Sequence, residues 1–183
     1  YHFDKPLVVQ FGLYLKMLSV GDLGPSYKYK SRTVNEIIGM GFPISVQLGL
    51  VAMFFATLIG IGAGVLAAVR QNSWVDYVSM TFAMIGVAIP NFVLGPLLIL
   101  LFSLTLWLLP PARWESWEHM ILPGFSLGLL YAASVARLSR GGMLEVLRQD
   151  FVRTARAKGL KEWVVIVRHT LRGGLLPVVS YLG

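Results

Sequence analysis

Long apolar stretches alternate with short polar ones along this chain. Residues 37–69, 77–112 and 120–136 contain no Asp, Glu, Lys or Arg. A helix needs about 20 apolar residues to cross the hydrocarbon core of a bilayer. The pattern therefore predicts an all-α polytopic membrane bundle with three spans, at about residues 42–69, 77–107 and 120–138.

A further apolar run begins near Gly173 and reaches Gly183. At a rise of about 1.5 Å per residue, a helix over residues 173–183 is too short to span. We therefore expect these residues to start another span that continues beyond Gly183. Because the sequence begins with Tyr1, we expect the chain to be truncated at both ends.

Small residues recur every fourth position in the first and third predicted spans. This spacing forms one stripe on a helix and allows a second helix to approach closely. Helix packing is the preferred interpretation, and a pore lining is the alternative. The predicted packing positions are Ala56, Gly60, Gly64, Gly124 and Gly128.

The middle of the second span contains Gly86 and Pro90. Proline bends a helix because it lacks a backbone donor. The pair is a candidate hinge, although a static kink is the preferred interpretation. Asn91 follows directly, and its amide would either satisfy a freed carbonyl or face a polar path. The sequence assigns no substrate-binding role to Asn91 or to Gln47.

Composition excludes a soluble domain: 56% of residues are hydrophobic and 14% are charged, against about 25% charged in soluble proteins. Residues 137–172 hold nine Lys/Arg against three acids. Lys/Arg-rich loops lie on the cytoplasmic side, which places 137–172 inside and residues 1–36 and 108–119 outside. Residues 1–41 are then an extracytoplasmic segment with a short interfacial helix at 5–20, and 42–183 are the membrane domain.

Motifs for chemistry are missing from the sequence. It contains no Cys, no phosphate-binding G-x-x-x-x-G-K-[ST] loop and no H-E-x-x-H or G-x-S-x-G motif. The spans lack the acids and His that serve as proton relays. We expect no catalytic residue, no metal and no cofactor in this chain, and if it moves a solute, the energy comes from elsewhere.

The basic segment at about 139–172 has two amphipathic parts separated by Gly159. The first places Met143, Leu147, Phe151 and Ala155 on one predicted helical face. The second contains Leu160, Trp163, Val164, Val167 and Leu171. A helix on anionic lipid, a nucleic-acid patch and a docking helix are the three interpretations. A docking helix explains most features of the segment, because Ala155 and Gly159 permit close approach of a partner.

RTARAKGL followed by RHTLRGGLLPV resembles the EAA signature of permease subunits of ATP-binding-cassette importers. Arg153 and Thr154 replace the Glu and the first Ala, which is typical of the dipeptide/oligopeptide/nickel branch, and Arg172 stands where Pro would be. Stretches such as FAMIGVAIPNFVLGPLL are similar to the oligopeptide-permease B-type subunits. The positions aligned with the signature, or adjoining it, are Arg153, Thr154, Ala155, Lys158, Gly159, Leu160, His169 and Leu171.

The resemblance implies a type I importer permease in a bacterial plasma membrane, with no enzyme activity of its own. It implies a second, homologous permease subunit, two cytoplasmic ATPases that bind ATP and Mg, an extracytoplasmic substrate-binding protein and a peptide substrate. Residues 139–172 would couple the pathway to the ATPases. A permease for dipeptides, glutathione or nickel is one alternative, and a membrane scaffold with no solute path is another.

Overall fold

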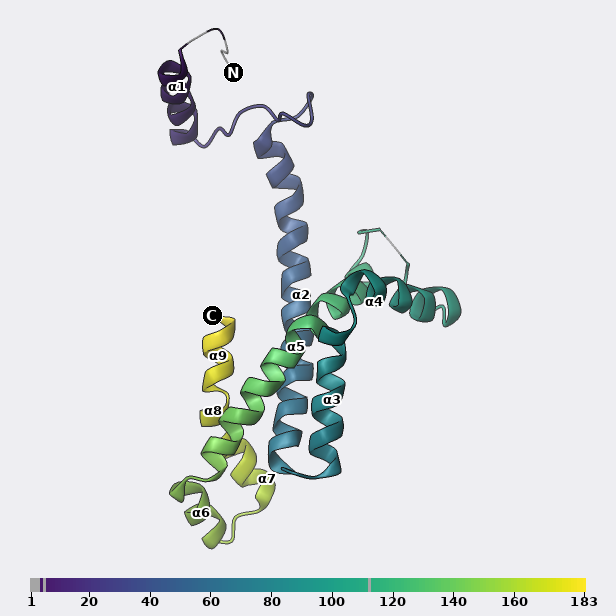
Figure 1. Ribbon diagram of the computed structural model, residues 1–183, viewed down its shortest axis with the longest axis vertical. Helices are drawn as coiled ribbons and strands as arrows, with labels where there is room; N and C mark the ends of the chain where they lie inside the picture. The colour runs from purple at the N-terminus through teal and green to yellow at the C-terminus, as the bar shows by residue number, and fades with distance from the viewer. Residues whose placement is uncertain (1–3, 5, 112) are drawn as a thin grey trace. The chain divides into compact units, whose positions relative to one another are not determined.

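The computed structural model describes residues 4, 6–111 and 113–183, and their regular secondary structure is helical (Figure 1). They separate into two compact units, residues 1–47 and 48–183, which are described in turn. Two helices, α2 (Val34–Val69) and α5 (Glu118–Leu147), are long and apolar enough to cross a membrane. A bent helix pair counts as a third span if it is taken as one.

The first unit holds α1 (Leu7–Ser19), a loop and the beginning of α2. The helix predicted at residues 5–20 is present as α1. Thr33 and Glu36 form a capping box, in which each backbone N–H donates to the other's side chain at 3.2 Å. This cap starts α2 at Val34, several residues before the predicted span.

The second unit contains the rest of α2 and all the elements that follow it. The elements between α2 and α5 are α3 (Trp74–Ala88), α4 (Asn91–Leu98) and η1, a π-helical stretch (Ile99–Thr105).

The second predicted span is broken, not merely kinked. The helix axis turns by 105° between α3 and the segment that starts at Asn91. Ile89 is extended, with φ −101° and ψ 119°, because a residue that precedes proline is disfavoured in the helical region. The bend expected at Pro90 is present, and it is so sharp that Pro90 separates two helices with different directions.

The small residues of α2 and α5 lie against one another. A Cβ added at Gly64 would lie 2.5 Å from the Ala136 carbonyl oxygen, and one at Gly128 would lie 2.5 Å from that of Ala52. These distances are too short for any side chain, so backbone meets backbone where the helices cross. The same contact includes all the positions singled out by their spacing: Ala56, Gly60, Gly64, Gly124 and Gly128.

Short helices follow α5 and return along it. They are α6 (Asp150–Ala157), α7 (Glu162–Val164), the π-helical η2 (Val165–Thr170), α8 (Leu171–Gly174) and α9 (Leu176–Leu182).

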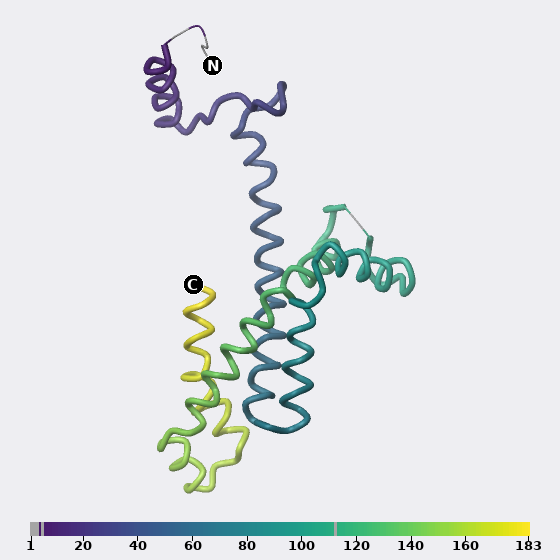
Figure 2. The backbone as a smooth tube through the Cα atoms, in the orientation of Figure 1, coloured from purple at the N-terminus to yellow at the C-terminus, as the bar shows by residue number. Residues whose placement is uncertain are grey.

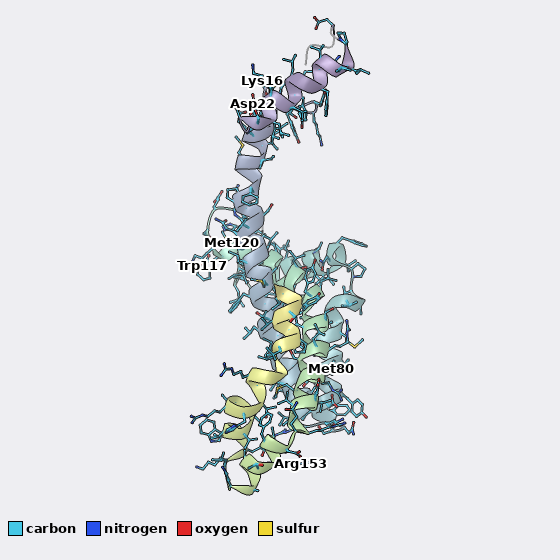
Figure 3. The ribbon with its side chains drawn as sticks, turned by 90° about the vertical axis from the view of Figure 1, so that its left-hand side faces the viewer. Lys16, Asp22, Met80, Trp117, Met120 and Arg153 are labelled. Atoms are coloured by element: carbon cyan, nitrogen blue, oxygen red, sulfur yellow. The ribbon has the colours of Figure 1, made fainter. Side chains whose placement is uncertain are left out.

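The single helical face predicted from Met143 through Ala155 was wrong. α5 ends at Leu147, and Gln149 is extended with φ −76° and ψ 153°, so the chain changes direction before α6. Within the second unit, α6 and α7 lie at the same end as the turn between α2 and α3 (Figure 2). Trp117 and Arg153 lie toward opposite ends of this unit (Figure 3).

Candidate functional site

The basic segment folds around a small apolar cluster of its own. Val152 and Val165 are fully buried, and Val146 and Ala155 are nearly so. Ala155 is only 5% exposed, and its methyl group faces this cluster. The structure therefore gives Ala155 an internal packing role, and its side chain is not presented at the surface.

Gly159 ends α6 in a left-handed conformation, with φ +77°. Its N–H donates to the Arg156 carbonyl at 2.9 Å, which closes the last turn of the helix. An added Cβ would meet nothing within 4 Å, so local crowding does not explain the glycine. The backbone conformation explains the glycine, because residues other than Gly and Asn rarely adopt a positive φ.

An ion pair closes the turn around Gly159. Arg156 donates from Nη2 to Glu162 Oε1 at 2.6 Å and from Nε to Oε2 at 3.2 Å. This hydrogen bonding lowers the pKa of Glu162 and raises the pKa of Arg156. Both side chains are about half exposed, so the pair shapes the turn more than it stabilises the fold.

The other aligned positions lie around the same turn. Arg153 is exposed and pairs with Asp150 at 3.5 Å, and the Thr154 hydroxyl donates to the Asp150 carbonyl at 2.9 Å. Lys158 and Leu160 are exposed, whereas His169 and Leu171 are half-buried.

Four exposed apolar side chains form what we call the outer surface of the basic segment: Phe151, Leu160, Trp163 and Val167. Trp163 is 65% exposed and Val167 is 57% exposed. The sequence placed the last three on one amphipathic face, and the structure turns that face away from the cluster. The buried positions of η2 are instead Val165 and Thr170.

A partly buried ion pair anchors the same end of the unit. Arg140 in α5 donates to both carboxylate oxygens of Asp76, from Nε at 2.8 Å and from Nη2 at 2.7 Å. Asp76 Oδ2 also accepts the Asn72 N–H at 3.0 Å. Sequence patterns do not reveal this pair, because the two residues are 64 positions apart. The available signal was an acid and a base, each just outside a predicted span.

The candidate hinge residues have different surroundings. Gly86 is buried where α3 meets α5, and any Cβ there would collide with the Leu129 carbonyl. Pro90 lies at the break itself. A hinge motion at these residues stays a prediction.

A cavity of about 390 Å³ lies beside this break. Its walls are mostly apolar, and its polar groups belong to Asn91, Arg113, His119 and Ser126. Asn91 Oδ1 is buried and has no hydrogen-bond partner among the described residues. The sequence left open whether Asn91 satisfies a freed carbonyl or faces a polar path, and the structure places it on the wall of this cavity.

In the part of the chain that the structure describes, no three His, Cys, Asp or Glu side chains come together as a metal site. Two pairs of charged side chains lie instead at helix ends and turns, Asp76 with Arg140 and Arg156 with Glu162. These pairs hold helix ends and turns in place.

Residues 60–183, which include both ion pairs and the cavity's polar residues, match the family described as "binding-protein-dependent transport system inner membrane component". The chain belongs to this family. Its relatives agree with that assignment over a longer stretch, because the similarity also covers the first unit.

The chain is 50% identical to the oligopeptide transport system permease protein OppB of Haemophilus influenzae, over all of this chain and 60% of the relative. It is 46% identical to the dipeptide transport system permease protein DppB of Bacillus subtilis, over all of this chain and 59% of that protein. The glutathione transport system permease protein GsiC of Escherichia coli is 42% identical, over 98% of this chain and 58% of the relative. The chain thus spans about three-fifths of the length of these relatives.

Proposed function

We propose that the chain is part of the membrane-spanning subunit of an ATP-driven oligopeptide importer. The observation that carries this proposal is the 50% identity to oligopeptide permeases over the whole chain. The family match supports a transport subunit without enzyme activity of its own. Dipeptides and glutathione are the runner-up substrates, because the permeases named for them are less similar.

The basic segment supports coupling to cytoplasmic ATPases. Its own apolar cluster fixes the position of α6, and its outer surface presents Leu160 and Trp163 among the exposed cations Arg153, Lys158 and Lys161. Aromatic and apolar anchors ringed by charge are typical of a protein-binding surface. We infer that the ATPases bind here and that ATP and Mg are held by them, not by this chain.

The topology follows from charge. Residues 137–172 lie on the cytoplasmic side by the positive-inside rule. The Asp76–Arg140 pair supports this placement, because it brings the turn at 70–76 to the same end as the basic segment. The loop near Trp117 then faces outward, toward a substrate-binding protein, and a second permease subunit completes the pathway.

Peptide uptake tests the proposal. Cells that lack the gene for this subunit should take up labelled oligopeptides only when the complete subunit is restored. Labelled dipeptides, glutathione and nickel, each offered separately, decide among the substrates. Uptake of all four that is independent of the subunit would overturn the import function and favour a scaffold.

The interaction surface has its own test. Trp163→Asp places a charge on the outer surface, and we expect the complete subunit to lose its ATPase partner on purification. Trp74→Asp is the matched control, since Trp74 is 80% exposed but lies outside the basic segment. Equal recovery of the ATPase with both variants would contradict this assignment of the docking surface.

A further inference from the structure

The cavity beside Pro90 combines apolar walls with an unsatisfied polar group. A buried acceptor without a hydrogen-bond partner costs about 1–3 kcal/mol of stability. Such groups are rare in native structures and call for an explanation, such as a functional role or a bound partner. The Asn91 amide offers either its acceptor or its donors by rotation about one bond. Oδ1 has no accessible surface in this conformation, so a ligand with a backbone amide would satisfy it once the side chain has rotated toward the cavity.

His119 supplies the complementary group. The Ser116 N–H donates to His119 Nδ1 at 3.2 Å, and the Ser116 hydroxyl lies 2.9 Å from the same nitrogen. Nδ1 therefore acts as an acceptor, which leaves Nε2 as the donor of the ring. His119 lines the same cavity as Asn91, which gives the cavity an acceptor and a donor.

The size and position of the cavity fit part of a peptide. Its volume of 390 Å³ is at the lower end of about 300–1,000 Å³ for ligand pockets, enough for a portion of an extended chain. Its apolar walls include Leu122 and Leu127. It adjoins the loop near Trp117, which is the end of the unit where an imported solute would arrive.

We propose that this cavity binds one apolar residue of the transported peptide, whose backbone amide pairs with Asn91 and His119. The proposal rests on the import function proposed above. It assigns solute-contacting residues within the permease itself. Leu122 and Leu127 contact the peptide side chain, and Asn91 recognises the backbone, which every peptide shares.

Cross-linking tests the assignment directly. Residues 1–183 contain no Cys, so Ser126→Cys places the one thiol of this stretch on the cavity wall. In the complete subunit within its assembled importer, this thiol should capture a peptide that carries a thiol-reactive disulfide on one apolar side chain. Thr105→Cys, exposed and outside the lining, is the control and should react only at background level.

Substitution of the amide gives a second readout. Asn91→Leu should raise the peptide concentration for half-maximal uptake about five- to tenfold, the loss of one hydrogen bond to the solute. Ser103→Ala removes a buried hydroxyl outside the cavity and should leave this concentration unchanged. If Asn91→Leu does not assemble, the Ser126→Cys cross-link in the otherwise native subunit decides.

The outcomes separate the two proposals. If the native subunit takes up peptide normally but the Ser126→Cys subunit forms no cross-link, the cavity assignment is overturned and the import function still stands. If Asn91→Leu leaves the peptide concentration for half-maximal uptake unchanged, the cavity assignment is also overturned, because the native Asn91 amide then makes no hydrogen bond to the peptide. Absence of uptake by the native subunit overturns the import function on which the assignment rests.

Discussion

Arg140 holds Asp76 with two parallel hydrogen bonds, and the carboxylate side chain is only 6% exposed. The contact joins the beginning of α3 to the C-terminal part of α5. α6 follows this part of α5 after only a short break. The pair therefore fixes the turn between α2 and α3 relative to the proposed docking segment.

Removal of the arginine should destabilise the subunit strongly. Arg140→Met leaves a buried carboxylate without its partner, and we expect a loss of about 3 kcal/mol in the free energy of unfolding. Thermal unfolding of the purified complete subunit in detergent measures this loss. Asp76→Asn combined with Arg140→Met should recover part of it, because the buried charge is then gone.

Arg113→Met is the matched control for this prediction. Arg113 pairs with Glu115 at 3.3 Å, but both side chains are largely exposed. Such a pair contributes well under about 1 kcal/mol. Equal effects of the two substitutions would show that the Asp76–Arg140 pair has no special structural role.

The crossing of α2 and α5 predicts opposite effects for two glycines two residues apart. Gly64→Ala drives a methyl group into the Ala136 carbonyl and should cost about 2 kcal/mol or more, since backbone must move. Gly62→Ala has open space and should be neutral or stabilise by up to about 1 kcal/mol through helix propensity. Thermal unfolding of both variants checks the pair, and a similar loss in each would contradict the observed packing.

Substitutions at Gly159 distinguish a conformational role from a contact role. If positive φ explains the glycine, Gly159→Ala should cost about 1 kcal/mol and Gly159→Asn less, because Asn tolerates this conformation. If close approach of the ATPase explains it, the larger Asn should impair peptide uptake more than Ala. Gly159→Asp should leave insertion intact and uncouple ATP hydrolysis from uptake. Measured stability and uptake of all three variants separate these roles.

The turn around Gly159 should loosen in acid. Arg156 lowers the pKa of Glu162 below its usual value, so the pair's contribution is complete above the ordinary Glu pKa. It is lost as the pH falls through the lowered pKa, when the carboxylate takes up a proton. Because the pair is half exposed, its contribution is below about 1 kcal/mol.

Hydrogen exchange at Lys158–Leu160 measures this loosening. The exchange, corrected for its intrinsic pH dependence, should rise as the pH falls through the range in which Glu162 takes up its proton. Glu162→Gln should show the looser state at every pH. If Glu162→Gln keeps the native dependence of exchange on pH, a group other than Glu162 is responsible for the loosening.

Sequence patterns predicted most elements but not their directions. The helix at the N-terminus, the helices at the first and third spans and the Gly turn in the basic segment all follow from local periodicity and caps. The face from Met143 to Ala155 could not be judged in this way, because the break at Gln149 lies inside a continuous helical pattern. The same break explains why Ala155 is buried in the chain's own cluster, although its spacing indicated a surface for a partner.

The sequence alone determined the membrane class, the proposed orientation and the family, since uncharged runs, Lys/Arg bias and linear motifs are local properties. The tertiary structure alone decided that Asp76 meets Arg140, that two stripes of small residues face one another, and that Asn91 lies on a cavity wall, with Oδ1 lacking a partner among the described residues. The first two are contacts between distant segments, and the cavity wall is built from segments far apart in the sequence. Spacing along the chain records which face of a helix a residue occupies, but it does not record what that face meets.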